Sequence, residues 1–267
     1  MDSKIIKALI ILFFFTNLQA AEFKGSFKQG SFILGKTEPG SKVTIDDKKI
    51  KVTEDGYFVF GLDRDRKNNI IIKTYNKGKQ KTFEKVVYKR KYKIQKIDGL
   101  PEKKVTPPKE VYERIKRENR LIGNARSIES DLTFFTKKFI SPLDKAIVTG
   151  VYGSQRILNG KPKWPHYGID FAAKEGTKIK AMLDGTATMV EPDLFYTGGT
   201  LIFDHGHGIS TLYMHMRDIY VKKGQKIKQG DIIGTVGSTG RSTGPHLDVR
   251  LNWFDVRLDP ATVLNVK

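Results

Sequence analysis

Cysteine is absent from this chain of 267 residues, and histidine is scarce. Without cysteine the fold cannot depend on disulfides, and a metal site would have no thiolate ligands. The five histidines are confined to the C-terminal part, since none precedes His166. Imidazole and carboxylate are the groups that hold zinc where thiolate is missing, so this clustering predicts a metal site in the C-terminal part of the chain.

A hydrophobic run long enough to cross a membrane is also missing. The apolar stretch Ala8 to Phe15 is much shorter than the roughly 20 residues that a membrane span requires. It follows two lysines and precedes Leu18-Gln-Ala20, an order that predicts a secretory signal peptide over residues 1–20. A buried N-terminal helix or strand is the alternative. We expect a mature protein that begins near Ala21, has no transmembrane segment and is periplasmic or secreted.

Basic residues are concentrated in the first part of the chain, and the formal net charge is +19. Residues 21–165 carry 34 basic and 17 acidic side chains, whereas residues 166–267 carry 12 and 11. This asymmetry favours contact between the N-terminal part and an anionic envelope surface, such as a cell-wall polymer or phospholipid headgroups. Nucleic acid is not expected as a partner of an exported protein. The alternative is that the lysines only solvate exposed strands.

Residues 21–97 are predicted to form a small β-sandwich. Short apolar stretches, such as Lys42 to Ile45 and Ile70 to Ile72, are separated by turn sequences at a spacing typical of that fold. The stretch Pro39-Gly-Ser-Lys-Val-Thr-Ile45, followed by Asp55-Gly-Tyr-Phe58, resembles bacterial immunoglobulin-like modules. Since this region holds no catalytic constellation, we expect a spacer or binding domain.

Residues 98–138 are predicted to form a linker and one connecting helix. Thr106-Pro-Pro108 interrupts the strands, and the stretch from Lys109 to Ile122 places its apolar residues on one face. From residue 139 to residue 267 short strands return, separated by glycine-containing loops and without a periodic repeat. The predicted fold class is therefore all-β with one connecting helix.

Three short segments of the C-terminal part hold the candidate metal chemistry: His166-Tyr-Gly-Ile-Asp170, Tyr213-Met-His215 and His246-Leu-Asp248. Four extended residues span about 13 Å, too far for two side chains to reach one ion. His166 is therefore expected in a loop, with a bend at Gly168 before the strand that carries Asp170. His246 and Asp248 lie two residues apart and share one face of a strand.

Together with further landmarks, these segments resemble the lysostaphin-like zinc metallopeptidases, which are murein endopeptidases that cut peptide cross-links in bacterial cell walls. The resemblance runs from about Phe139 to Ala261 and includes Gly153-Ser-Gln-Arg156, Asp204-His-Gly-His-Gly208, Gln229-Gly-Asp-Ile-Ile-Gly234 and Gly240-Arg-Ser-Thr-Gly-Pro-His246. It implies a lysostaphin-type β-sheet peptidase domain over residues 139–267. It also implies Zn²⁺ as cofactor and peptidoglycan as substrate.

The same resemblance implies a role for each site residue. His166 and Asp170 would bind the zinc ion, while His215 and His246 would act on the water and the transition state. The family usually places a histidine as third zinc ligand where this chain has Asp248.

This departure leaves three alternatives. Asp248 can still coordinate the ion, or the site takes Mn²⁺ or another divalent metal, which carboxylate-rich sites suit better. In the third alternative metal binding is lost, and the domain binds peptidoglycan or regulates a cell-wall amidase without catalysis. Because four of the five positions are intact and aspartate is itself a metal ligand, we favour an exported metalloendopeptidase that uses a metal-activated water.

Roles in the substrate cleft or in a turn are predicted for several other polar residues. Arg156, Asn159 and Tyr196 are candidates for lining the substrate cleft. His205 and His207 flank Gly206 and are expected to have structural roles in a turn. The stretch from Val221 to Asp231 also resembles the hairpin of biotinyl and lipoyl carrier domains, but it lacks their methionine-flanked lysine.

Overall fold

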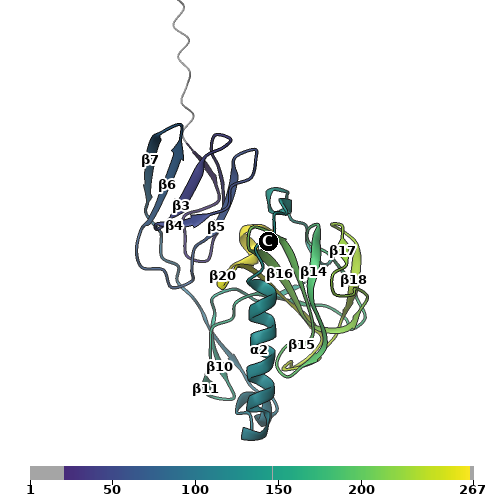
Figure 1. Ribbon diagram of the computed structural model, residues 1–267. Helices are drawn as coiled ribbons and strands as arrows, with labels where there is room; N and C mark the ends of the chain where they lie inside the picture. Colours follow the sequence, from purple (N-terminus) through teal and green to yellow (C-terminus); the bar gives the residue numbers. More distant parts are fainter. Residues whose placement is uncertain (1–20, 146, 265–267) are drawn as a thin grey trace, which may run out of the picture.

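The computed structural model describes residues 21–145 and 147–264, which form two β-rich parts joined by a helical connector (Figure 1). One long helix, α2 (Tyr112–Arg126), runs alongside the C-terminal sheet. The predicted all-β class with one connecting helix is confirmed. The predicted signal peptide lies outside the described residues. Within the described ranges, no helix is long and apolar enough to cross a bilayer.

The N-terminal part consists of two antiparallel sheets with a common apolar core. One sheet has the order β1 (Glu22–Lys24), β2 (Phe32–Lys36), β5 (Tyr57–Gly61), and the other has the order β4 (Lys48–Ile50), β3 (Lys42–Ile45), β6 (Ile70–Asn76), β7 (Lys79–Lys85). In β6, Ile70 and Ile72 are buried while Ile71 between them is exposed. This alternation is expected of a strand that turns one face to the core.

Strand β8 (Ile94–Ile97) belongs to neither sandwich sheet, although the predicted sandwich extended to residue 97. It pairs in parallel with β10 (Gln155–Leu158), which pairs in turn with β11 (Lys161–Pro162). Where so short a strand pairs depends on its tertiary neighbours more than on its own residues. The chain that leaves the sandwich is thereby hydrogen-bonded to the segment that carries Arg156.

The connector contains a short helix, α1 (Glu102–Val105), a 3-10 turn over Lys109–Val111, and α2. The helix that the sequence predicts over residues 109–122 begins in this turn but continues to residue 126. It passes Gly123 because Ile122 and Ala125 pack against apolar residues of the C-terminal sheet. The connector is therefore packed against the C-terminal sheet near the end of this helix.

The C-terminal part is built on a ten-stranded sheet. Its main path is β17-β14-β15-β16-β19-β12-β9, while β18 pairs with both β13 and β16, and β20 pairs with β19. The strands are β9 (Ile147–Gly150), β12 (Ile169–Ala172), β13 (Lys178–Lys180), β14 (Gly185–Leu194), β15 (Gly198–Gly206), β16 (Ile209–Ile219), β17 (Lys226–Ile227), β18 (Ile232–Val236), β19 (His246–Trp253) and β20 (Val256–Leu258). Two 3-10 turns cover Phe134–Thr136 and Pro260–Thr262. Strand β15 is buried along its whole length, so the centre of the sheet is covered on both faces.

The two β-rich parts share one hydrophobic core. Phe32 of β2 meets Phe139 edge-on with ring centroids 6.1 Å apart, and Leu258 packs against the backbone of β5. The guanidinium group of Arg64, from the N-terminal part, donates two hydrogen bonds to the carbonyl oxygen of Gly153 at 3.0 and 2.7 Å. The N-terminal part therefore braces the loop that precedes β10.

His205 is a buried core residue of β15. Its Nδ1 lies 2.7 Å from the carbonyl oxygen of Asp184, and its Nε2 lies 2.7 Å from Oγ1 of Thr211. Burial lowers the pKa of His205 to about 4, so the ring is neutral near pH 7. The turn that the sequence predicts at this place is occupied by His207, which has a φ of 50°.

We predict that His205 makes the free energy of unfolding fall as the pH falls from 6.5 to about 4. Within this window the imidazole of the unfolded chain takes up a proton and that of the folded chain does not, so acid favours unfolding. Above pH 6.5 none of this stability is lost, and the full loss, which is reached below about pH 4, amounts to ~3 kcal/mol. Denaturant unfolding of the wild type and of His205→Gln at several pH values measures it. The variant should lose less stability over the window, and parallel curves would contradict the assignment.

Candidate metal centre

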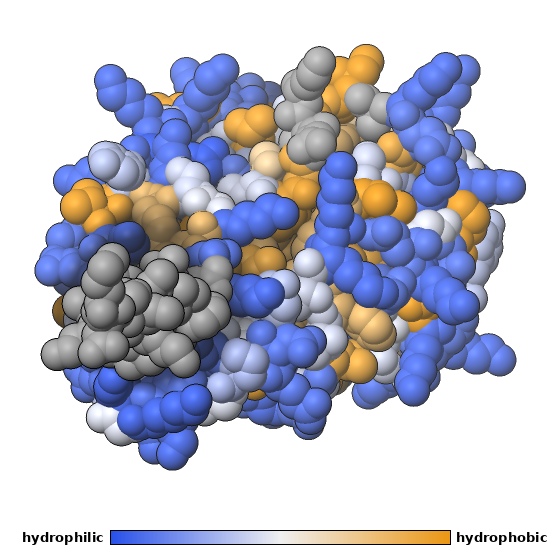
Figure 2. Space-filling model, turned by 90° about the horizontal axis from the view of Figure 1, so that it is seen from above, coloured by the Kyte–Doolittle hydropathy of each residue, from blue (hydrophilic) through white to orange (hydrophobic). Residues whose placement is uncertain are grey.

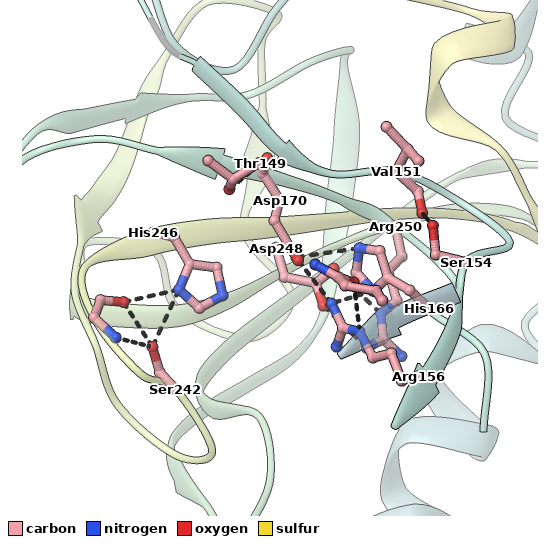
Figure 3. A network of polar contacts seen from close by, with 12 residues as sticks. Thr149, Val151, Ser154, Arg156, His166, Asp170, Ser242, His246, Asp248 and Arg250 are labelled. Atoms are coloured by element: carbon pink, nitrogen blue, oxygen red, sulfur yellow. Dashed lines mark hydrogen bonds and ion pairs between the residues drawn. The ribbon is translucent and has the colours of Figure 1, made fainter. Parts of the chain in front are cut away.

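Strand pairing brings the three predicted metal ligands together. Strands β12 and β19 are antiparallel, with Asp170 directly opposite Asp248. His166 lies in the loop before β12, and its Nε2 is 3.1 Å from Oδ1 of Asp170 while its Nδ1 is 3.9 Å from Oδ2 of Asp248. All three residues are buried, and one ligand atom from each lies within 4.8 Å of the others (Figure 3). This arrangement is compact enough for one ion to contact all three.

The donor atoms of this group are short of partners. Both ring nitrogens of His166 and Oδ1 of Asp170 are buried, and none of them makes a hydrogen bond within residues 21–145 and 147–264, although Nε2 lies 3.1 Å from Oδ1. A buried polar atom without a partner costs about 1–3 kcal/mol. A divalent cation held by His166, Asp170 and Asp248 would satisfy these atoms, and an imidazole with two carboxylates suits zinc or manganese. The residues therefore fit a metal ion.

Two glycines make room for the two carboxylates. A Cβ at Gly150 would lie 2.1 Å from Oδ2 of Asp170, and a Cβ at Gly168 would lie 2.4 Å from Oδ1 of Asp248. The sequence predicts a bend of the chain at Gly168. Its backbone does not have a positive φ, however. The structure instead requires glycine there because the carboxylate approaches the backbone so closely.

Each carboxylate is paired with an arginine. Nη2 of Arg156 lies 2.7 Å from Oδ2 of Asp170, and Nη2 of Arg250 lies 3.0 Å from Oδ2 of Asp248 (Figure 3). Burial alone would raise the pKa of Asp248, but Arg250 and His166 outweigh it and hold this pKa well below its usual range. For Asp170, burial is likewise outweighed by His166 and Arg156, and the pKa is lowered. Both carboxyl groups are therefore ionised, as metal ligands must be.

Arg250 was not predicted as a site residue, although its spacing from Asp248 could have indicated a role. It lies two residues after Asp248 on the same strand, so both side chains leave the same face of the sheet. A cation at this spacing can pair with the carboxylate. The negative charge that aspartate adds at position 248, compared with histidine, is thus balanced by a neighbouring cation.

The backbone of His215 is strained. The residue lies in β16 with a φ of 62°, a left-handed conformation that costs a non-glycine residue about 1–2 kcal/mol. The pairing of β16 with β15 shifts register here, because the step from Tyr213 to Met216 faces the shorter step from Leu201 to Gly199. This is a β-bulge, which redirects a side chain. The bulge brings the His215 ring to 4.7 Å from the His246 ring, measured between centroids.

Backbone carbonyls fix the tautomers of both rings. Nδ1 of His215 lies 2.8 Å from the carbonyl oxygen of Thr239, and Nδ1 of His246 lies 2.9 Å from that of Gly244. A carbonyl oxygen only accepts, so each Nδ1 carries a hydrogen, and Nε2 is the nitrogen that has the free lone pair in the neutral ring. Burial, assisted by His246, lowers the pKa of His215 to about 4. The ring is therefore a neutral acceptor near pH 7.

A pocket of about 310 Å³ opens over these groups. Its lining includes Asp170, His215 and His246 together with Arg156 and Arg241. The pocket lining thus combines one carboxylate of the candidate metal group, two imidazoles and two guanidinium groups.

Two predicted cleft residues do not line this pocket. The side-chain amide of Asn159 donates to the carbonyl oxygen of Leu100 and accepts from its N–H, so it ties the connector to the end of β10. The ring of Tyr196 lies under the guanidinium group of Arg241, whose carbon is 4.5 Å from the ring centroid. Tyr196 therefore supports Arg241, which lines the pocket, and does not line the pocket itself. The third predicted cleft residue, Arg156, does line the pocket, where it is bound to Asp170.

Comparison with known proteins identifies a family for this part of the chain. Residues 164–260 match peptidase family M23. The chain is 44% identical over 87 residues to the peptidoglycan DD-endopeptidase ShyA of Vibrio cholerae, and 43% identical over 89 residues to the DD-carboxypeptidase/endopeptidase Mpg of Neisseria meningitidis. Each match covers 33% of this chain but only 20% of the relative. The chain thus matches about a fifth of the length of these curated relatives.

The similarity in structure extends further along the chain. A crystal structure from Pseudomonas aeruginosa, described as a peptidase M23, superposes with a TM-score of 0.69 at 25% sequence identity. The superposition covers 89% of this chain and 95% of the other. The arrangement of two β-rich parts and a connector is therefore shared with that protein.

We predict that Gly168→Ala disturbs the ligand group, because its Cβ would collide with Oδ1 of Asp248 and with the carbonyl oxygen of Val249. Overpacking of this kind costs about 1–3 kcal/mol of stability. The variant should also bind less metal, measured by elemental analysis after dialysis. Gly244→Ala is the matched control, since a Cβ there meets no atom within 4 Å. Equal metal content and stability in the two variants would show that the close approach of Asp248 to Gly168 affects neither metal binding nor folding.

Proposed function

We propose that this chain, whose residues 164–260 form a domain of peptidase family M23, is an exported endopeptidase that uses a divalent metal ion to hydrolyse peptide cross-links of peptidoglycan. The observation that carries the proposal is a three-residue ligand group, His166, Asp170 and Asp248, next to a pocket that Asp170 and the imidazoles of His215 and His246 line. The relatives ShyA and Mpg are a peptidoglycan DD-endopeptidase and a DD-carboxypeptidase/endopeptidase, and they supply the substrate class.

The ion would be held by His166, Asp170 and Asp248, and when bound it supplies Lewis acidity at the pocket. His215 and His246 have the remaining roles. Each presents a free Nε2, so each can accept a proton from the attacking water, and the resulting imidazolium can stabilise the oxyanion. The hydrogen bond from Nδ1 to a backbone carbonyl holds either ring in place while Nε2 changes protonation.

We propose Zn²⁺ as the ion, with Mn²⁺ as the alternative that the second carboxylate favours. One imidazole and two carboxylates give a formally neutral complex with a divalent cation, whereas the usual set of two imidazoles and one carboxylate leaves a charge of +1. The less positive complex is a weaker Lewis acid, so we expect slower turnover than in relatives with a histidine at this position.

One observation favours a second candidate function. Arg156 and Arg250 neutralise both carboxylates with groups of the chain itself, so the site can be stable without an ion. A domain of this kind would bind peptidoglycan or regulate an amidase and would not hydrolyse peptides. The two candidates differ in metal content and in turnover.

We predict that His166→Ala removes the ion and abolishes turnover, whereas His215→Ala and His246→Ala abolish turnover but keep the ion. The first residue is assigned to binding the metal and the other two to proton transfer. The measurements are elemental analysis and chromatography of digested muropeptides, with His207→Ala as a control outside the pocket. Full metal occupancy in His166→Ala would refute the ligand assignment. A wild type that is inactive with every divalent metal would favour the binding function.

We also propose that the basic N-terminal part contacts an anionic envelope surface. Exposed lysines of this part include Lys42 and Lys49, and hydrophilic side chains dominate the face seen in Figure 2. Because exposed charges are screened beyond about 8–10 Å near physiological ionic strength, binding to isolated sacculi should weaken steeply as salt is added.

Co-sedimentation with sacculi tests this proposal. Lys42→Gln combined with Lys49→Gln should weaken binding at low salt more than the control pair Lys222→Gln and Lys223→Gln, which removes two exposed lysines of the C-terminal part. Binding that does not depend on salt, or equal effects of the two pairs, would contradict a role for the N-terminal charge. Anionic vesicles in place of sacculi separate phospholipid headgroups from cell-wall polymer as the target.

A further inference from the structure

Arg241 is a pocket cation without an anionic partner. It lies in the loop between β18 and β19 and lines the same pocket as His215 and His246. The other two arginines of the site each hold a carboxylate, Arg156 at 2.7 Å and Arg250 at 3.0 Å. Among the ion pairs of residues 21–145 and 147–264, none includes Arg241.

The hydrogen-bonding capacity of this side chain is almost unused. A guanidinium group has five N–H donors. Within the described residues, the Arg241 side chain donates one long hydrogen bond, from Nη1 to the carbonyl oxygen of Lys104 at 3.4 Å. Burial lowers the pKa of Arg241, and the nearby cations Arg156 and Arg250 lower it further. An anion in the pocket would relieve that repulsion.

The position of Arg241 is fixed in advance of any ligand. Its backbone N–H donates to the carbonyl oxygen of Tyr196 at 2.8 Å, and its guanidinium group lies over the Tyr196 ring. The preceding Gly240 has a φ of 73°, and a Cβ there would collide with the backbone of residues 196–198. Thr239, one residue earlier, orients His215 through its carbonyl oxygen. The loop that positions Arg241 therefore also positions a proton acceptor of the site.

We infer that Arg241 binds a carboxylate of the substrate peptide and so selects peptides that carry a free acid next to the bond that is cut. This inference rests on the proposed function, since it concerns the substrate of the same pocket. Guanidinium matches the planar geometry of a carboxylate, and two parallel hydrogen bonds give the pairing its specificity. The charge balance agrees, because the pocket lining contains two guanidinium groups and one carboxylate.

A peptide can present such a carboxylate at its C-terminus or on a side chain. Two pairs of synthetic cross-linked stem peptides separate these sources. In one pair the C-terminus is free or amidated, and in the other a side-chain carboxylate is free or amidated. The wild type should bind and cleave the free acid of one pair with an advantage of roughly 10- to 100-fold over its amide.

Arg241→Gln should remove this advantage, mainly through KM, and leave the amidated peptides unaffected. Arg241→Lys, which keeps the charge but loses the paired donors, should be intermediate. Arg120→Gln, an exposed arginine of α2, controls for loss of one positive charge. Thermal unfolding of each variant checks that the fold is retained.

Binding of the same peptides, measured by calorimetry, does not require turnover. Acid-selective binding that is lost in Arg241→Gln supports the inference even if no peptide is cleaved, in which case only the proposed hydrolysis fails. Equal binding of acids and amides by the wild type overturns the inference. So does a loss in Arg241→Gln that is the same for all peptides, or the absence of any peptide binding.

Discussion

The site depends on two carboxylates, Asp170 and Asp248, that face each other across β12 and β19 in the interior of the protein. Like charges this close and this deeply buried repel each other strongly unless cations compensate them. Arg156 and Arg250 supply two positive charges, and Gly150 and Gly168 leave the space into which the carboxylate oxygens project. The buried ring nitrogens of His166, which make no hydrogen bond within the described residues, leave this group suited to one more cation.

The N-terminal part helps to hold in place the residues that surround these two carboxylates. Arg64 donates to the carbonyl oxygen of Gly153, and the N–H of Gly153 donates to the carbonyl oxygen of His166 at 2.7 Å. Strand β8 pairs with β10, so Gln95 lies beside Arg156, with 3.4 Å between its Oε1 and Nε of the arginine. Both the loop that carries His166 and the strand that carries Arg156 are thus held by residues that precede residue 98.

Conformational strain is concentrated on the other wall of the pocket. His215 adopts a left-handed conformation within a strand, and the surrounding bulge and the carbonyl oxygen of Thr239 hold it there. Strain of this kind persists where neighbouring structure over-determines the conformation, and it is common at functional sites. Here it turns a side chain out of the regular alternation of β16 and toward His246. The loop that contributes Thr239 also contributes Arg241, so one loop holds both His215 and Arg241 in place.

Much of the fold and of the site could be predicted from local sequence. Short apolar stretches such as Ile70 to Ile72, separated by turn sequences, indicated the strands, and the family resemblance read from His166, Asp170, His215 and His246 is confirmed by the match over residues 164–260. The ligand spacing also predicted that His166 precedes its strand, where the structure places it. These features depend on neighbours in sequence, which is why they can be recognised without coordinates of the rest of the chain.

The tertiary structure alone decided the features that depend on distant pairing. Helix α2 continues past Gly123 because the C-terminal sheet supplies an apolar surface, and β8 leaves the sandwich because β10 offers it hydrogen bonds. Arg156 lines the pocket and is paired with Asp170, whereas Asn159 is hydrogen-bonded to Leu100. Arginine has a long flexible side chain, and its sequence position does not reveal which anion it reaches. That choice is made by residues that only folding brings within a few ångströms of one another.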